Sequence, residues 1–311
     1  MESRWRDEDA ARMPELEGLV YASRLVGADE ALVLWGGGNT SAKLEETDFR
    51  GRRVSVLRVK GSGSDLRTIR TEQFPGVRLE DVLPLRERAD MEDAAMVAYL
   101  TQTLMEAGSP RPSIETLLHA FIPAKFVVHS HADAILMLTN TSRGKELVRD
   151  ALGEGAVWVE YRRPGFLLSR EVGEAYREDA RCIVLAKHGL VTWGETAREA
   201  YERHVEAVSE AERFVAGRSS AVKNGDVAAQ RTAYAAIAPV LRGLAARTRG
   251  DGTVAEKWEA GRPVEVGATA RLVLRLEDSE EVVRFVSSAE AARVSQVGPA
   301  TPDHMLYTRR T

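Results

Sequence analysis

Short apolar runs, each ended by glycine or by polar residues, recur along the chain. The clearest are ALVLW (31–35), RVSVLRV (53–59), KFVVHSH (125–131), GAVWVEY (155–161), RCIVLAK (181–187) and LVTW (190–193). Runs of this length are typical of strands, and segments of helical spacing lie between them without a strict strand–helix–strand repeat. The pattern predicts a layered α/β fold with a mixed central sheet. None of the runs reaches the ~18 to 20 apolar residues of a membrane span, so we expect no membrane partner.

The segments between these runs space their apolar residues as helices do. We expect helices over about 14–26, 91–107, 114–121, 132–139, 144–152, 169–178 and 196–217. The composition changes after Arg218. Beyond it we expect a linker over 219–226, a helix over 230–247, a loop over 248–263, a strand over 271–278 and a helix over 279–288. The sequence therefore predicts one domain over 14–218 and a C-terminal α+β extension over 219–311 that packs on the core.

The composition excludes several classes of protein. The chain has 311 residues, six histidines, a single cysteine and a formal net charge of −4. One cysteine excludes an intrachain disulfide framework and any site with four thiolates from one chain, and we expect Cys182 to be a buried, inert thiol. Since there is no dense basic block, we expect no nucleic-acid partner. The charged N-terminus has no apolar signal region, so we expect a cytoplasmic protein.

Histidines stand at the ends of two predicted strands. His129 and His131 flank Ser130 and would point to the same face of a strand, which lets two imidazoles bind one metal ion. His188 follows the run RCIVLAK and precedes Gly189. Three imidazoles from two strand ends could hold Zn²⁺ with at least one open position, as catalytic zinc sites do. The alternative is that these histidines are hydrogen-bonded structural groups.

Glu115 stands in the segment PSIE, at the start of a predicted helix. A glutamate in a first helical turn stabilises the helix dipole, and Ser113 is suited to capping that helix. The other interpretation makes Glu115 an acid/base near the metal. Spacing alone favours the structural role.

Two glycine-rich turns are each expected to follow a strand: GGGNTS (36–41) and KGSGS (60–64). Glycine lets a backbone approach a ligand closely, and convergent amides bind phosphate oxygens. Neither turn matches a P-loop or a dinucleotide-binding fingerprint, and most turns of this kind bind nothing.

Taken in order, these motifs resemble the class II aldolase/adducin family. The resemblance rests on GGNTS, VKGSGSDL, PSIE, VVHSHAD and KHGL and covers about 14–218. It implies a three-layer α/β/α subunit in a homotetramer, with active sites near subunit boundaries. It implies one Zn²⁺ per subunit, held by His129, His131 and His188, with Glu115 as catalytic acid/base. The phosphate group of the substrate would be bound by Gly38, Asn39, Ser62, Gly63 and Ser113.

The C-terminal part also resembles a known protein class. RLVLRLEDSEEVVRFV and GPATPDH look like the end of the aldolase part of bifunctional rhamnulose-1-phosphate aldolase/alcohol dehydrogenases. A dehydrogenase domain follows in those proteins, and we expect it to be absent or removed here. The chain departs from the family pattern at Ile114, which replaces a second hydroxyl residue before Glu115. No tyrosine aligns as the second proton-transfer group, and the candidates are Tyr161, His304 and Tyr307.

The resemblance implies a lyase of carbohydrate metabolism. The reaction would be reversible aldol cleavage of a ketose 1-phosphate, similar to rhamnulose or fuculose 1-phosphate, to dihydroxyacetone phosphate and an aldehyde. Alternatives from the same family are a pentulose-phosphate 4-epimerase, a dehydratase or a decarboxylase. A non-enzymatic, adducin-like interaction protein is another possibility. A structural metal module is a further one, and it would need a fourth protein ligand such as His304.

Overall fold

The computed structural model describes residues 1–218, 227–245, 247–248, 269–270 and 273–307. The chain divides into two compact units. The first combines Met1–Ser219 with the C-terminal segment Pro299–Thr311, and the second is Ser220–Gly298. The predicted linker over 219–226 and most of the predicted loop over 248–263 lie outside the described residues. Every residue of the candidate site belongs to the first unit.

A seven-stranded sheet forms the centre of the first unit, in the order β3-β2-β1-β4-β7-β6-β5. Its strands are β1 (Asn39–Thr47), β2 (Arg53–Val59), β3 (Gly76–Arg78), β4 (Phe126–Ser130), β5 (Ala156–Val159), β6 (Cys182–Leu185) and β7 (Gly189–Gly194). Only the β5–β6 pair is parallel, and the other neighbours are antiparallel. The predicted mixed sheet is therefore confirmed. In this order β1 and β4 are interior strands, and β4 lies between β1 and β7.

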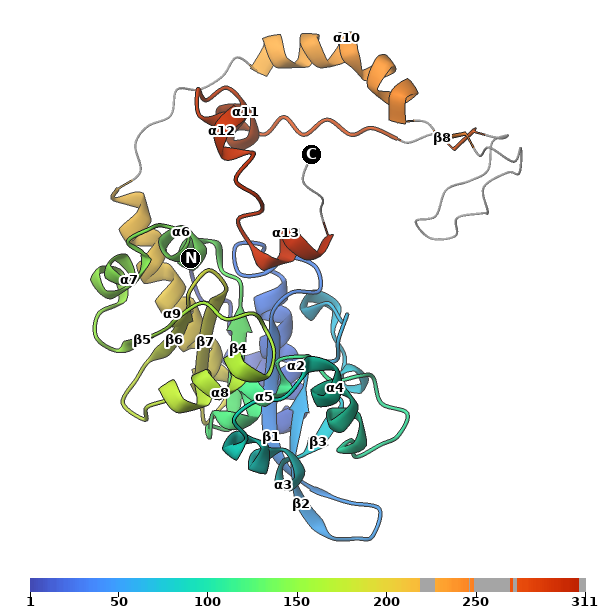
Figure 1. Ribbon diagram of the computed structural model, residues 1–311, viewed down its shortest axis with the longest axis vertical. Helices are drawn as coiled ribbons and strands as arrows, with labels where there is room; N and C mark the ends of the chain where they lie inside the picture. The colour runs from blue at the N-terminus through green and yellow to red at the C-terminus, as the bar shows by residue number, and fades with distance from the viewer. Residues whose placement is uncertain (219–226, 246, 249–268, 271–272, 308–311) are drawn as a thin grey trace. The chain divides into compact units, whose positions relative to one another are not determined.

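The helices of the first unit cover both faces of this sheet (Figure 1). They are α1 (Asp7–Ala10), α2 (Glu15–Gly27), α3 (Leu79–Val82), α4 (Asp93–Gln102), α5 (Thr116–Phe121), α6 (Asp133–Thr139), α7 (Gly144–Leu152), α8 (Phe166–Ala175), α9 (Ala197–Ala216) and α13 (Pro302–Tyr307). Short 3₁₀ turns occupy Leu66–Thr68, Thr71–Gln73 and Leu83–Glu87. None of the helices in the described residues is long and apolar enough to span a membrane.

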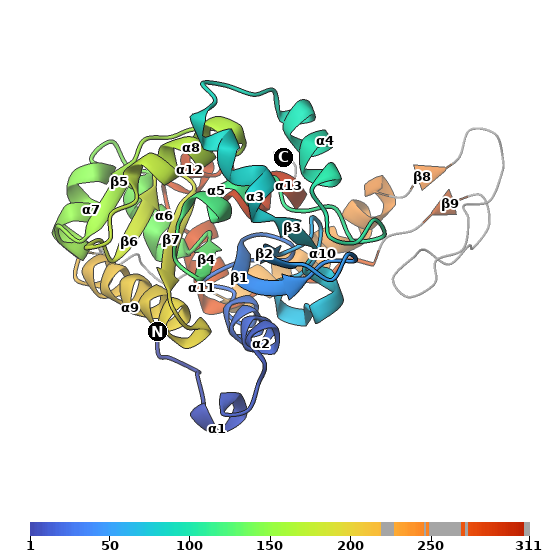
Figure 2. The same cartoon turned by 90° about the horizontal axis from the view of Figure 1, so that it is seen from below.

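Alternate residues of the central strands pack into opposite layers. In β4, Phe126 and Val128 join the apolar cluster built with α2, α6 and α9, whereas Val127 joins the cluster built with α5 and α8. Cys182 and Ile183 divide in the same way on β6. Figure 2 shows the sheet between α2 and α9 on one side and α3, α5 and α8 on the other. Strands buried on both faces explain the nearly continuous apolar runs in the sequence, and the predicted three-layer α/β/α fold is confirmed.

Three local predictions are wrong. ALVLW (31–35) forms turns and no strand, and β1 begins at Asn39, so the first glycine-rich turn precedes a strand. The helix predicted over 91–107 ends at Gln102. Within the predicted strand over 271–278, the described residues 273–278 have no regular structure. In each case apolar residues suggested a strand or a longer helix, but the backbone forms turns, ends early or has no regular structure there. Val273 is even 93% exposed, so its apolar segment packs against no core.

The second unit is described only in part. It contains α10 (Val227–Ala245), the two-stranded pair β8 (Arg247–Thr248) and β9 (Thr269–Ala270), α11 (Glu280–Val286) and α12 (Ala291–Val294). Pro239 lies inside α10, and the two predicted helices of this region coincide with α10 and α11.

A polar group is buried between α9 and the sheet. His204 of α9 is fully buried, and its Nε2 and Nδ1 lie 2.7 Å from Ser130 Oγ and 2.9 Å from Thr192 Oγ1. Ser130 separates His129 from His131, so this contact supports the backbone at the end of β4. Burial lowers the pKa of His204 from 6.5 to about 3, which keeps the imidazole neutral at pH 7.

The pH dependence of unfolding tests this burial. His204 has a pKa of 6.5 in the unfolded chain and of about 3 in the folded chain. Between these values only the unfolded chain binds the proton, so the free energy of unfolding falls as the pH drops from about 6.5 to about 3. Between pH 7 and pH 5 His204 should remove about 2 kcal/mol. Urea unfolding of the metal-free protein measures the free energy of unfolding at both pH values. Between pH 7 and pH 5 the His204→Gln variant should lose about 2 kcal/mol less stability than the unaltered protein does. Equal losses in the two proteins would mean that the imidazole is not buried and neutral.

Candidate metal and catalytic site

Two histidines project from the end of β4. In the sheet, His129 is paired with Asn39 of β1 and with Val191 of β7, so its neighbours on both sides are fixed by strand register. Its Nδ1 lies 3.0 Å from the Leu190 carbonyl oxygen. A hydrogen on Nδ1 donates to that carbonyl and leaves the Nε2 lone pair available. His131 follows the strand, and 7% of its side chain is exposed.

His188 reaches the same place from the β6–β7 hairpin. Its predecessor Lys187 has φ +56°, an uncommon left-handed conformation for a residue with a Cβ, which turns the chain sharply. The next residue, Gly189, packs against the end of β4, and a Cβ there would lie 2.1 Å from the Ser130 carbonyl oxygen. Glycine is therefore required at position 189 for the close approach that brings His188 beside His129.

The three imidazoles form one buried cluster. One ring nitrogen from each of His129, His131 and His188 lies within 4.8 Å of the other two, and the ring centroids are 4.9 to 5.2 Å apart. The Nε2 atoms of His129 and His131 are buried and have no hydrogen-bond partner among the described residues. Such orphaned nitrogens are costly unless a ligand satisfies them. The three buried histidines could therefore bind a metal ion.

The protonation of the cluster favours the same role. Burial lowers the pKa of His188 to about 3, and it also lowers the pKa of His129. Both rings are therefore neutral at pH 7, the form in which imidazole binds metals.

Glu115 turns its carboxylate toward this cluster. It lies directly before α5, and its Oε1 and Oε2 are 3.3 Å from His188 Nε2 and 3.6 Å from His129 Nε2. Burial raises the pKa of Glu115, but the positive charge that the three imidazoles carry when protonated and the Asn39 hydrogen bond outweigh it and lower the pKa to about 2. Glu115 is only 6% exposed, and its Oε1 has no hydrogen-bond partner among the described residues. A buried, ionised carboxylate beside three imidazoles is suited to proton transfer.

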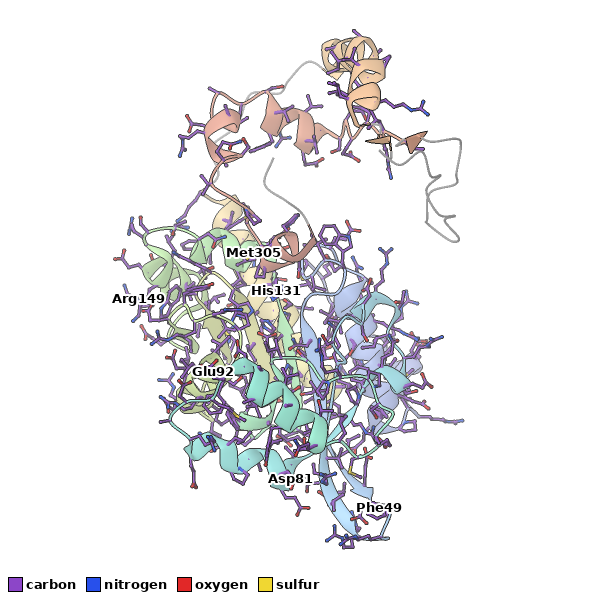
Figure 3. The ribbon with its side chains drawn as sticks, turned by 45° about the vertical axis from the view of Figure 1, so that its right-hand side comes forward. Phe49, Asp81, Glu92, His131, Arg149 and Met305 are labelled. Atoms are coloured by element: carbon purple, nitrogen blue, oxygen red, sulfur yellow. The ribbon has the colours of Figure 1, made fainter. Side chains whose placement is uncertain are left out.

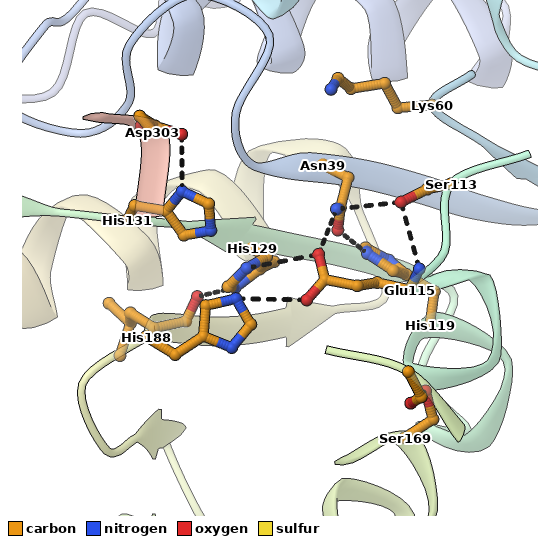
Figure 4. A network of polar contacts seen from close by, with 12 residues as sticks. Asn39, Lys60, Ser113, Glu115, His119, His129, His131, Ser169, His188 and Asp303 are labelled. Atoms are coloured by element: carbon orange, nitrogen blue, oxygen red, sulfur yellow. Dashed lines mark hydrogen bonds and ion pairs between the residues drawn. The ribbon is translucent and has the colours of Figure 1, made fainter. Parts of the chain in front are cut away.

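A hydrogen-bond chain orients this carboxylate (Figure 4). Asn39 Nδ2 donates to Glu115 Oε2 at 2.6 Å and lies 3.3 Å from Ser113 Oγ. On its other side Asn39 Oδ1 accepts from His119 Nε2, and His119 Nδ1 lies 2.7 Å from Ser41 Oγ. Burial lowers the pKa of His119 to about 3, so its neutral ring has one N–H to donate to Asn39. Sequence reasoning missed His119, because a histidine in an apolar helix gives no signal of this contact.

The residues predicted to bind phosphate lie in adjoining segments. The turn 60–64 pairs with the segment before α5, since the backbone N–H of Ser62 donates to Arg111 O and that of Ser113 to Lys60 O. Gly38 and Gly63 have φ +57° and +79°, the left-handed conformation that glycine adopts without strain. Gly38 directly precedes Asn39, and Ser62 and Gly63 are exposed.

Lys60 joins the two glycine-rich turns, a contact that the sequence did not reveal. Its buried Nζ donates to the Gly36 carbonyl oxygen at 2.6 Å. Burial lowers the pKa of Lys60 to about 8, although Glu115 and Asp303 oppose this. A cation therefore lies behind the turns, where it can balance the charge of an anionic ligand.

The candidates for a second proton-transfer group are dispersed. Tyr161 is 54% exposed and is not among the contacts of Glu115 or of the three imidazoles. His304 lies in the C-terminal helix α13, and its Nδ1 is 2.6 Å from Thr301 Oγ1. The side chain of Tyr307 lies outside the described residues. The residue of α13 that contacts the cluster is Asp303, whose Oδ1 lies 2.8 Å from His131 Nδ1, and sequence reasoning missed it.

Comparison with known protein families gives two matches. Residues 17–215 match the family model described as "Class II Aldolase and Adducin N-terminal domain". Residues 232–311 match the one described as "Aldolase class II, second domain".

Three individual proteins are similar to this chain. The "Uncharacterized oxidoreductase YuxG" of Bacillus subtilis (strain 168) is 39% identical over 320 residues, which cover 98% of this chain and 43% of that protein. The chain thus spans less than half the length of this curated relative. The structure of the N-terminal class II aldolase domain of a conserved protein from Thermoplasma acidophilum has 47% identity and a TM-score of 0.66, covering 69% of this chain and 99% of that one. A sugar-phosphate aldolase from Thermotoga maritima is similar in fold alone, with 18% identity, a TM-score of 0.50, and coverage of 65% and 93%.

Metal analysis tests the histidine cluster. Purified protein should bind about one divalent metal per chain, because three imidazoles converge in one buried place. His129→Ala should abolish this binding, whereas the matched change His304→Ala, in a histidine outside the cluster, should leave it intact. Isothermal titration with Zn²⁺ measures both. Full binding by His129→Ala would contradict the site, and loss in His304→Ala would assign His304 as a fourth ligand.

Proposed function

The chain belongs to the class II aldolase and adducin family, and on that premise we propose that it is a zinc-dependent aldolase. The reaction is reversible cleavage of a ketose 1-phosphate, similar to rhamnulose or fuculose 1-phosphate, to dihydroxyacetone phosphate and an aldehyde. The observation that supports this most is the placement of Glu115 within 3.3 to 3.6 Å of two imidazoles of a buried three-histidine cluster. The sequence-based assignment to this family is confirmed, whereas the aldolase activity, the substrate and the metal belong to the proposal.

His129, His131 and His188 fit Zn²⁺ by their chemistry. Imidazole nitrogen is a preferred zinc ligand, and three protein ligands are the usual set where a position stays open for substrate. The orphaned Nε2 atoms of His129 and His131 support this assignment. When bound, such a metal acts as a Lewis acid that stabilises the negative charge developing on the substrate oxygens.

Glu115 moves the proton at the reacting carbon. In cleavage the bond between C3 and C4 of the ketose breaks, the C4 hydroxyl loses its proton to a second group, and the electron pair stays with the C3 fragment. Glu115, which starts as a carboxylate, takes up one proton from solvent and delivers it to C3, which gives dihydroxyacetone phosphate; this proton balances the one lost from the C4 hydroxyl. In the synthetic direction it removes that proton. The Asn39 hydrogen bond at 2.6 Å holds the carboxylate facing the imidazoles for this step.

The two glycine-rich turns orient the phosphate group. Ser62 and Gly63 offer exposed backbone and a hydroxyl, while Asn39 and Ser113 adjoin Glu115. Binding energy at the phosphate fixes the reacting carbons without contributing to the chemistry itself. Ile114, 38% exposed, replaces a hydroxyl that would have added one more donor.

An assembly is part of the proposal. Tyr161 is exposed and does not contact Glu115 or the imidazoles of its own chain. We therefore place it, as a second proton-transfer group, at the site of another copy in a homotetramer, where active sites lie near subunit boundaries. His304 is the candidate from within the same chain, since it adjoins Asp303 at the cluster. A cytoplasmic location stays a prediction.

The alternatives differ in their products or in their need for a metal. A pentulose-phosphate 4-epimerase uses the same residues but releases no triose phosphate, and dehydratases or decarboxylases release water or carbon dioxide. A non-enzymatic, adducin-like role is disfavoured by a buried carboxylate set among three imidazoles, which costs stability without a ligand. The oxidoreductase name belongs to a relative of which this chain spans 43%, and we assign no hydride transfer to the residues described here.

A product screen tests the proposed reaction. Rhamnulose 1-phosphate and fuculose 1-phosphate should release triose phosphate, detected with a coupled glycerol-phosphate dehydrogenase, and chelation followed by Zn²⁺ should abolish and restore the release. Isomerisation of a pentulose phosphate without triose phosphate would favour the epimerase. Turnover unaffected by complete metal removal would overturn the zinc-dependent aldolase.

Glu115→Gln separates metal binding from proton transfer. The amide keeps the size of the side chain and can still contact Asn39, but it accepts no proton, so kcat should fall by about 10²- to 10⁴-fold. Zn²⁺ affinity should change little, because Glu115 is not one of the three imidazoles. Steady-state kinetics and titration of the same sample measure both. Near-normal kcat would return Glu115 to a helix-stabilising role.

A further inference from the structure

A carboxylate from the end of the chain lies against one of the three clustered histidines. Asp303, in α13, is 1% exposed, and its Oδ1 lies 2.8 Å from His131 Nδ1. Its Oδ2 accepts a hydrogen bond from the backbone N–H of Leu34 at 3.0 Å. Both carboxylate oxygens are therefore engaged, and Figure 4 shows the carboxylate on the side of His131 away from Glu115.

The segment that bears Asp303 is anchored by several independent contacts. Asn140 Nδ2 donates to the Ala300 carbonyl oxygen at 2.8 Å, and Thr301 is buried. His304 packs edge-on against Trp35 with ring centroids 5.7 Å apart. Figure 3 shows α13 over His131 with Met305 on its outer side, and Met305 is 69% exposed. The short helix therefore presents one face to the site and the other to solvent.

The chain also leaves room for this carboxylate. A Cβ on Gly37 would lie 1.6 Å from Asp303 Oδ1, so any larger residue at position 37 would occupy the place of the carboxylate. The first glycine-rich turn is thus shaped partly by Asp303, a reason for glycine that differs from phosphate binding.

The contact determines which nitrogen of His131 is free. A neutral imidazole has one N–H, and a carboxylate acceptor at Nδ1 holds the hydrogen there. The Nε2 lone pair is then directed into the cluster, where Nε2 is buried without a hydrogen-bond partner among the described residues. His129 is held in the same way by the Leu190 carbonyl. An anionic acceptor also makes the imidazole a stronger electron donor than a carbonyl does.

We propose that Asp303 is a positioning residue of the metal centre: it fixes the tautomer and the ring orientation of His131, so that the C-terminal segment completes the site. Asp303 lies within the match to the second-domain family model (232–311), whereas the three histidines lie within the first (17–215). The metal centre of this chain thus depends on residues of both family regions. The inference rests on the metal-binding part of the proposed function and is independent of the reaction catalysed.

Metal affinity of the full-length chain tests the proposal. Asp303→Asn keeps the size of the side chain but removes its charge, and Asp303→Ala removes the acceptor. Competition with a chromophoric chelator should show Zn²⁺ bound about 10- to 100-fold more weakly in these variants, with the larger loss in Asp303→Ala. The matched control Asn140→Ala removes one anchor of the same segment but leaves the Asp303 carboxylate in place, so it should lose clearly less Zn²⁺ affinity than Asp303→Ala. Equal losses in Asn140→Ala and Asp303→Ala, or unchanged affinity in Asp303→Ala, would overturn the proposal.

Gly37→Ala provides a second route that leaves the carboxylate intact. The added methyl group would displace Asp303 from His131, so this variant should reproduce most of the loss of Zn²⁺ affinity. Gly108→Ala adds a methyl group where no atom lies within 4 Å and serves as its control. Normal affinity in Gly37→Ala with a folded circular dichroism spectrum would contradict the proposed contact.

The tautomer of His131 can be read without any metal. In metal-free protein, ¹⁵N-detected imidazole spectra should show the hydrogen of His131 on Nδ1, and Asp303→Ala should convert the ring to a mixture of tautomers. If the unaltered protein binds no Zn²⁺, the proposed function fails while this measurement still decides the role of Asp303. A hydrogen on Nε2 in the unaltered protein would refute the positioning role.

Discussion

The pairing of β4 with β1 on one side and β7 on the other is the constraint on which the site depends. This pairing places Asn39, His129 and Val191 side by side across three strands. Asn39, which hydrogen-bonds to Glu115, is therefore held beside the imidazole of His129. Gly189 allows the β6–β7 hairpin to approach the end of β4, because a side chain there would collide with the Ser130 carbonyl. The remaining contributions, Glu115 before α5 and Asp303 in α13, come to this point from outside the sheet. The geometry of the cluster is thus inherited from strand register, which packing on both faces makes rigid.

Burying so many polar groups is unfavourable unless each one has a partner. Around the cluster most of them do: His119 lies between Asn39 and Ser41, His204 lies between Ser130 and Thr192, and Asp303 binds both His131 and a backbone N–H. Among the described residues, the exceptions at the cluster are Nε2 of His129, Nε2 of His131, Nδ1 of His188 and Oε1 of Glu115. Unsatisfied atoms concentrated at one cluster, among neighbours that are hydrogen-bonded, are suited to binding a ligand such as a metal ion.

Much of the layered architecture could be predicted from the sequence, since β4, β6 and β7 are apolar on both faces and give continuous runs. The strand β1 could not, because Asn39, Ser41 and Lys43 contact His119 where a core strand would present apolar side chains. Its function in the site removed the pattern that identifies strands. The order of the motifs in the sequence identified His129, His131, His188 and Glu115 as candidate site residues, and in the structure their side chains lie together. Asp303 was out of reach, because 172 positions separate it from His131 and no local pattern encodes such a contact. For the same reason sequence reasoning selected His304, its neighbour, as the residue of interest in PATPDH.

The central claim is that the three histidines form an open metal centre, with at least one position left for substrate. X-ray absorption at the zinc K edge of the Zn²⁺-loaded protein tests this most directly, since it reports the kind and number of ligand atoms. The account predicts three imidazole nitrogens at about 2.0–2.1 Å together with one or more exchangeable oxygen ligands and no sulfur. The spectrum should change when a ketose 1-phosphate is added. A closed shell of four protein ligands, unchanged by substrate, would contradict the account and make the centre a structural one.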